Sequence, residues 1–410
     1  MKAVDFLSVL NEASGFVLAN RMGDSFQFRM SKDGQVTLYS SVFAVMTLHY
    51  TGALRQFTDG EKHAWADYIN SFQDPDTGIY RAPEIFEGQI EGGGHNEEHL
   101  ALHLVAHILP ALDLLDSSPK YKLDFARKFL NIETLRSWLS DRDWSKAWLE
   151  GNNLLFVGQL LVHMDETGVE GADQALEVFM QWLDDQVDPQ TGLWGTNGFC
   201  DRYTAIYGGY HQLLLYYYLR RPLVSPDKLI DTTLSIQHID GGYSRWNGGG
   251  TCQDVDAVDI LVNLYKLTPY RRRDIRRSLR RSYASVMRRK TIEGGFCDRA
   301  GHEFNHMGME MTRTPPDRAN MFSTWFGVHT IALMAEIFKQ DDPDCDSFYE
   351  IIKFNQKCSM GWHRKSTCGE LPSSENLERI FDQFLVSFQE LVVKVYRLKN
   401  NMRLILGSKM

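Results

Sequence analysis

Six nearly apolar helical segments recur along the chain, and this alternation restricts the fold more than any other feature. Their starts lie roughly 50–65 residues apart, a period that fits two helices and their loops. They span residues 36–50, 96–115, 152–164, 203–219, 254–267 and 320–338. Six amphipathic segments alternate with them, at 60–72, 121–140, 171–187, 225–237, 270–289 and 376–401. A helix that is apolar on all sides is buried, whereas one with a charged face lies outside. The pattern predicts an all-α fold, a single (α/α)6 barrel or toroid of six inner and six outer helices.

Recurring turns join these segments. A polar stretch, a glycine and an aromatic residue recur at 73–80, 186–194 and 237–243, and more weakly at 293–296. The pentapeptide Gly-Phe-Cys-Asp-Arg at 198–202 returns at 295–299. Because glycine permits the positive φ that such a turn needs, we expect short hairpins at the rim of the ring. We expect residues 1–410 to form one domain, with a less regular loop at 340–372 and a C-terminal outer helix at 376–401.

Charge and composition restrict the classes of function that the chain can have. The net charge of −9 disfavours a general nucleic-acid binder, which needs a basic face for phosphate contacts. The sequence has no run of about 18 apolar residues and no apolar stretch typical of a signal peptide, so we expect no membrane span. The six cysteines are scattered without a CxxC pair, which indicates a reducing cytoplasm. The oligomeric state stays open.

Polar residues gather where the predicted inner helices begin. In a closed ring these ends converge on one rim and form a concave site for a small molecule. Capping accounts for one polar residue per helix, whereas here they occur in clusters. The candidates are His95, Glu98, His99, Asn152, Asn153, Asp201, Arg202, Tyr203, Asp254, Asp256, Arg318 and Asn320, with His211 two turns beyond Tyr203. Arg202 and Tyr203 suit a carboxylate, a phosphate or a sugar hydroxyl.

The densest acidic cluster opens the segment at 254–267. Asp254, Asp256 and Asp259 follow the glycine run at 248–250. Neighbouring carboxylates repel each other when both are ionised, so the pKa of one rises and that group can remain a proton donor. The cluster therefore predicts a general acid. An N-cap aspartate beside two solvated neighbours is the structural alternative.

Histidines recur every fourth residue from His95 to His107 and therefore share one helix face. His95, Glu98 and His99 also match the inverted zinc-protease pattern, but the sequence offers no third ligand, so we assign no metal. We expect these three residues to act as acid, base or hydrogen-bonding groups, because histidine titrates near neutral pH. His103 and His107 lie among Leu and Ala and fit a packing role.

The turns with glutamine, aspartate, glycine and an aromatic residue resemble the repeats of the terpenoid cyclase and protein prenyltransferase superfamily, whose members are α/α toroids. The turn at 241–246, which ends at Trp246, together with Asp254-Val255-Asp256, is similar to the aspartate motif of class II terpene cyclases. The resemblance implies that Asp256 protonates an alkene or epoxide, supported by Asp254. The segment at 323–327, which contains Trp325, resembles the last inner helix of such rings.

The sequence departs from the family's pattern in three places. Ala257 stands where a threonine or an aspartate follows the acid, and the glutamine–tryptophan motif is nowhere complete. The zinc site of the prenyltransferase branch requires an Asp, a Cys and a His. The spacing of Cys252, Asp254 and either His302 or His306 does not reproduce it. The resemblance therefore supports the fold more strongly than the reaction.

Three functions stay open. The first is a class II cyclase-like enzyme, an isomerase that starts the cyclisation of an isoprenoid with Asp256 as acid and with Mg²⁺ as a candidate cofactor. The second is a carbohydrate-active enzyme, a lyase, epimerase or hydrolase that acts on a glycan. Here Glu98 or Asp256 would be the acid and His95, His99 or Tyr203 the base, an idea that rests on fold analogy. The third is a non-enzymatic ring that binds a partner through the arginines at 271–281.

Overall fold

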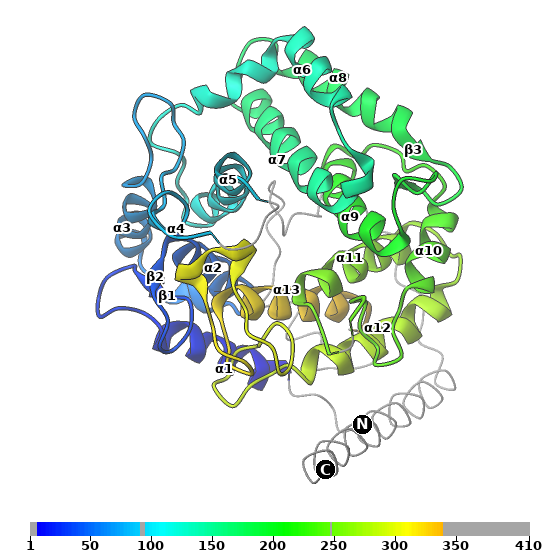
Figure 1. Ribbon diagram of the computed structural model, residues 1–410. Helices are drawn as coiled ribbons and strands as arrows, with labels where there is room; N and C mark the ends of the chain where they lie inside the picture. Colours follow the sequence, from blue (N-terminus) through cyan, green and yellow to red (C-terminus); the bar gives the residue numbers. More distant parts are fainter. Residues whose placement is uncertain (1–5, 91–94, 247, 339–410) are drawn as a thin grey trace, which may run out of the picture.

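The computed structural model describes residues 6–90, 95–246 and 248–338, which form a closed ring of helices (Figure 1). The inner helices are α2 (Leu38–Tyr50), α5 (Glu97–Leu114), α7 (Ala147–Glu166), α9 (Arg202–Leu219), α11 (Thr251–Leu267) and α13 (Met321–Phe338). Each inner helix contacts the next, and α13 contacts α2, so the inner ring closes on itself. The predicted all-α toroid is confirmed.

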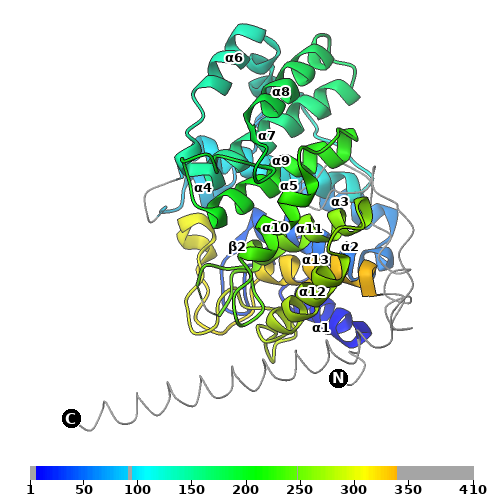
Figure 2. The same cartoon turned by 90° about the vertical axis from the view of Figure 1, so that its right-hand side faces the viewer.

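The outer helices lie around the outside of this inner ring, which Figure 2 shows from the side. They are α1 (Phe6–Ala19), α3 (Asp59–Asn70), α6 (Ile132–Ser140), α8 (Ala172–Gln186), α10 (Pro226–Ser235) and α12 (Arg272–Met287). The alternation did not predict α1, which packs against α2 and α13 and takes the sixth outer place among the described residues. The loop predicted at 340–372 and the outer helix predicted at 376–401 lie outside the described residues.

Short elements connect the helices, and they include the expected hairpins. Strand β1 (Phe28–Arg29) pairs antiparallel with β2 (Val36–Thr37), and β3 (Val187–Asp188) pairs in the same way with β4 (Leu193–Trp194). The remaining elements are the single-turn helix α4 (Pro83–Phe86) and the 3₁₀ turns η1 (Ala53–Gln56), η2 (Asp124–Leu130), η3 (Trp144–Lys146), η4 (His306–Gly308) and η5 (Glu310–Thr312).

Two of the repeated turns use their glutamine and glycine in the same way. Gln73 Nε2 donates to the carbonyl oxygen of Gly78 at 3.0 Å and to a backbone carbonyl of the segment ahead at 2.9 Å. Gln237 Nε2 repeats the pair to Gly241, at 2.9 Å, and to the following helix, at 2.8 Å. Gly78 and Gly241 have φ of 78° and 92°, and a Cβ at either would lie within 2.3 Å of a backbone oxygen. Each turn thus fastens one helical hairpin to the next.

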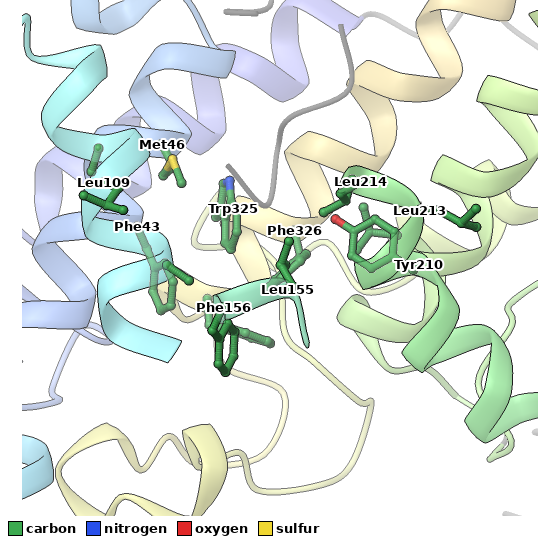
Figure 3. Close-up of a cluster of buried hydrophobic side chains, with 14 of the residues drawn as sticks. Phe43, Met46, Leu109, Leu155, Phe156, Tyr210, Leu213, Leu214, Trp325 and Phe326 are labelled. Atoms are coloured by element: carbon green, nitrogen blue, oxygen red, sulfur yellow. The ribbon is translucent and has the colours of Figure 1, made fainter. Parts of the chain in front are cut away.

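Apolar side chains fill the inside of the ring. Figure 3 shows Phe43 from α2, Leu109 from α5, Phe156 from α7, Tyr210 from α9 and Trp325 from α13 directed toward the interior. Trp325 is fully buried and stacks on Phe43 with ring centroids 5.4 Å apart. Among the described helices, only α13 is long and apolar enough to cross a membrane, and its side chains are buried within the ring.

Helices α7 and α9 approach each other at backbone contact. A Cβ on Gly151 would lie 2.5 Å from the Cα of Gly208, and a Cβ on Gly208 would lie 2.2 Å from the carbonyl oxygen of Ala147. Only glycine leaves room for this approach. The contact fixes the N-terminal half of α7, which contains Asn152. It lies beside the turn of α9 that precedes His211.

Candidate active site

A cavity of about 560 Å³ lies at the rim where the inner helices begin. Its walls come from α5, α7, α9, α11, α13 and the loop at 298–307. The volume falls within the range of about 300–1,000 Å³ that is usual for small-molecule sites. Of the residues predicted from the sequence, His95, Asn152, His211 and Asp256 meet in this cavity.

Asp256 is the carboxyl group in the buried part of the wall. It is 1% exposed, and its Oδ2 is enclosed and accepts no hydrogen bond from any described residue. Burial, followed by the negative charges of Asp259 and Asp254, raises the pKa of Asp256 well above its ordinary value. No described residue donates a hydrogen bond to Oδ2, so burial favours the protonated form of this group. Oδ1 is the oxygen left to meet a ligand.

The two neighbouring aspartates are held by the fold and do not line the cavity. Asp254 is fully buried, lies 2.5 Å from the guanidinium of Arg289 and accepts a backbone N–H bond at 2.7 Å. Asp259 is also fully buried and accepts a bond of 3.1 Å from Asn263 Nδ2, one turn along α11. Their contribution to the site is electrostatic, because their charges oppose ionisation of Asp256.

Histidines supply the basic groups of the cavity, and His95, His103, His211 and His306 all line it. Burial lowers the pKa of each, to about 4 for His211. His211 Nδ1 lies 2.7 Å from the carbonyl oxygen of Tyr207. Because a carbonyl only accepts, Nδ1 carries the proton and Nε2 keeps its lone pair. His211 is therefore a neutral base in the same cavity as Asp256.

The remaining wall is aromatic in its depth and charged at its mouth. Phe322 and Phe326 from α13 are buried, whereas Lys146 and Glu303 are exposed. Asp298, at the mouth, accepts bonds of 2.9 Å and 2.7 Å from the backbone N–H and hydroxyl of the first residue of α11. Lys146, Phe322 and Phe326 line the cavity but were not among the site residues predicted from the sequence. The two phenylalanines follow Asn320 by less than two turns, and only the rotation of α13 shows that they face the cavity.

Glu98, His99 and Asn153 line a second, separate hollow of about 220 Å³. Glu98 is exposed there and pairs with Lys128 at 3.0 Å. Glu98 and Asp256 therefore line different spaces. The structure does not bring them together as the two carboxylates that a paired-carboxylate mechanism on a glycan requires.

A third group of predicted residues lies at the start of α9, outside the cavity lining. Asp201 caps the helix by accepting from the backbone N–H of Thr204 at 3.1 Å, and it pairs with Arg245 at 2.5 Å. The guanidinium of Arg245 lies 5.6 Å from the ring centre of Tyr203. Arg202 is exposed.

The remaining predicted site residues make contacts within the fold. Arg318 pairs with Glu293 at 2.6 Å. Asn320 is fully buried and accepts a backbone N–H bond of 2.8 Å in the first turn of α13. Trp325 belongs to the apolar interior described above. Trp246 is 49% exposed on the turn before α11 and does not line the cavity.

The donor set does not fit a zinc ion of the prenyltransferase type. In the described part of the chain, no three His, Cys, Asp or Glu side chains are placed to hold one metal ion. Cys252 lines the cavity, but burial, followed by the charge of Asp298, raises the pKa of its thiol. A zinc ligand must be a thiolate, so Cys252, Asp254 and His306 do not form that site.

Comparison with known proteins agrees with this architecture. A family model described as "Prenyltransferase alpha-alpha toroid domain" matches residues 15–313, from α1 to the loop before α13. No curated protein matches the chain.

Proposed function

Since this chain belongs to the prenyltransferase alpha-alpha toroid family, we propose that it is a class II terpene cyclase-like enzyme in which Asp256 starts the cyclisation of an isoprenoid. One observation carries the proposal. A buried carboxyl group without hydrogen-bond donors among the described residues lines a cavity whose depth is aromatic and otherwise uncharged. Such a group is a proton donor at neutral pH.

The reaction begins when the Asp256 proton moves to a carbon of a substrate alkene, which leaves a carbocation and the Asp256 carboxylate. A second alkene of the same molecule attacks the cation and closes a ring. The faces of Phe322 and Phe326 stabilise the cation, because an aromatic ring attracts positive charge. Neutral histidines fit this step, since an imidazolium would repel the cation.

The reaction ends when a base removes a proton from a carbon beside the final cation, which forms a neutral alkene. His211 Nε2 is the candidate, because its lone pair is fixed by the bond from Nδ1 to Tyr207. Asp256 has then lost one proton and His211 has gained one. The product is therefore an isomer of the substrate, and the enzyme returns to its starting state when His211 loses its proton to solvent and Asp256 regains one.

An assay with defined isoprenoids tests this proposal. The purified protein is incubated with geranyl, farnesyl and geranylgeranyl diphosphates and with squalene, with and without Mg²⁺, and products are identified by mass spectrometry. We expect a cyclic product whose rate falls by about 10²–10⁴-fold in Asp256→Asn. Asp173→Asn, an exposed aspartate on α8, is the matched control and should keep the activity.

Two results would overturn the proposal. One is the absence of a cyclic product from every substrate. The other is a product that Asp256→Asn forms as fast as the wild-type protein. Either would return the carbohydrate-active alternative to consideration, with the charged mouth as the guide to its substrate.

A further inference from the structure

His103 is a histidine of the main cavity to which the proposed reaction gives no role. It lies on α5, is 4% exposed and lines the cavity. Its Nε2 is open to the cavity, whereas the Nε2 atoms of His99 and His107, one turn before and one turn after it, are enclosed. A ligand in the main cavity can therefore reach the ring of His103 at this nitrogen.

Tyr39, on α2, fixes the position of the proton on His103. Tyr39 Oη lies 3.2 Å from the carbonyl oxygen of Leu100 and 2.8 Å from His103 Nδ1. Because a carbonyl only accepts, the single hydroxyl proton of Tyr39 goes to Leu100. The contact with His103 is then a hydrogen bond only if Nδ1 donates to Tyr39 Oη. The neutral ring thus carries its proton on Nδ1 and presents the lone pair of Nε2 to the cavity.

Both members of this pair are uncharged at neutral pH. Burial lowers the pKa of His103 well below its ordinary value and raises the pKa of Tyr39 well above its own. His103 Nε2 is therefore a neutral acceptor with a fixed orientation. An apolar ligand that covers this nitrogen leaves a buried acceptor unpaired, whereas a ligand hydroxyl group supplies the missing donor.

The charges at the mouth of the cavity oppose an anionic headgroup. Asp298, Glu303 and Lys146 line the cavity there. Lys146 already pairs with Asp143 at 3.3 Å, and Glu303 pairs with Arg313. A diphosphate would therefore meet two carboxylates, while the ammonium group in the described lining is already paired. An uncharged headgroup meets neither of these penalties.

We propose that the main cavity takes an uncharged isoprenoid alcohol, whose hydroxyl group donates to His103 Nε2. The proposal rests on the proposed function for the isoprenoid body, which the aromatic wall with Phe322 and Phe326 accommodates, and it adds the headgroup. His103 is then a positioning residue. It anchors one end of the chain, and this anchor decides which alkene lies at Asp256.

Calorimetric titration of the full chain tests the headgroup with three probes. The titrated protein carries Asp256→Asn, so that the proposed reaction does not start. Geraniol carries the hydroxyl donor, geranyl methyl ether lacks it, and geranyl diphosphate carries a charge in its place. We expect geraniol to bind about tenfold more tightly than the ether, because the ether leaves Nε2 unpaired. Geraniol should also bind more tightly than the diphosphate, with and without Mg²⁺.

Two variants in the same background assign this preference to His103. His103→Phe removes the acceptor, so the ratio of the geraniol and ether affinities should fall about tenfold. Tyr39→Phe keeps the imidazole but removes the acceptor that holds the proton on Nδ1, so the ratio should also fall. His107→Phe, one turn along α5 and outside the cavity lining, is the matched control and should keep the ratio. A purely structural change would weaken both ligands alike and leave the ratio unchanged.

Four results would overturn the proposal. They are binding of the ether as tight as that of geraniol, tighter binding of the diphosphate, a geraniol preference that survives in His103→Phe, and no binding of any probe. The proposed reaction fails in a different way. If the geraniol preference depends on His103 but the wild-type protein forms no cyclic product from geraniol or any other isoprenoid, the alcohol site stands and the reaction is rejected.

Discussion

Three aspartates within two turns of α11 illustrate how surroundings set the role of a residue. Asp254 has a guanidinium partner and Asp259 accepts a bond from Asn263, whereas Asp256 lines the cavity with its Oδ2 unpaired among the described residues. The spacing of the three in the sequence predicted that one of them would have a raised pKa. Which one depends on the rotation of the helix and on the place of Arg289, a residue 35 positions from Asp254.

The acid and the base make the pH dependence predictable. In the proposed reaction Asp256 acts only when protonated, and its pKa is raised, so activity should persist above the usual carboxyl range and fall as pH rises through that raised value. His211 acts only when neutral, and its pKa is lowered to about 4, so activity should also fall as pH drops through about 4. The dependence of kcat/KM on pH should be bell-shaped. A rate that increases with pH through neutrality would instead indicate Asp256 acting as a base.

Replacing His211 should change the product more than the consumption of substrate. In His211→Phe the proposed proton donor Asp256 remains, so cyclisation still starts, but the cation loses the proposed base. We expect other alkene isomers, or an alcohol formed by capture of water. Product ratios measured by chromatography and mass spectrometry provide the check. The control is His163→Phe, because His163 belongs to the inner helix α7 but does not line the cavity. An unchanged product ratio in His211→Phe would remove His211 from the mechanism.

At the scale of elements, the periodic pattern predicted the inner helices within a few residues, because a fully buried helix is apolar on every side. It did not predict α1, because none of the repeated turns in the sequence lies beside residues 6–19. The convergence of the helix starts on one rim was also predictable from the ring. The assignment of the histidines to two different hollows was not predictable, since His95 and His99 lie one turn apart on the same helix and still line different hollows. That division depends on how α5 is rotated against α7.

The close packing of α7 and α9 gives a prediction for stability. In Gly208→Ala the new Cβ would lie 2.2 Å from a backbone oxygen of α7, which cannot move aside as a side chain can. We expect the free energy of unfolding to fall by about 1–3 kcal/mol or more. Gly15→Ala, in α1, is the matched control, because its Cβ meets nothing within 4 Å. That change should stabilise α1 by about 0.5–1 kcal/mol. Denaturant unfolding measures the free energy of unfolding of both variants. An equal loss in Gly208→Ala and Gly15→Ala would contradict the predicted effect of the close packing.

Across the whole molecule, the buried histidines should make the ring sensitive to acid. Burial lowers the pKa of His107 and His211 to about 4, from 6.5. Below pH 6.5 the unfolded chain binds protons that the folded chain does not, so stability falls as pH drops toward 4. Each group contributes up to about 1.4 kcal/mol per pH unit, or roughly 3 kcal/mol for His107 over this window.

Denaturant unfolding between pH 7 and pH 4 checks this sensitivity. His107 does not line the cavity, so His107→Phe tests the contribution of one histidine without altering the site. We expect this variant to lose less stability over the window than the wild-type protein. An identical pH dependence in the two proteins would show that His107 titrates alike in the folded and unfolded states.

The central claim is that a proton from Asp256, and not loss of a substrate leaving group, starts the reaction. Turnover in deuterium oxide tests it most directly, because the Asp256 carboxyl exchanges with solvent before each cycle. The account predicts a cyclic product that carries one solvent deuterium on carbon and, from a diphosphate substrate, keeps its diphosphate. A product without deuterium, formed together with free diphosphate, would contradict it.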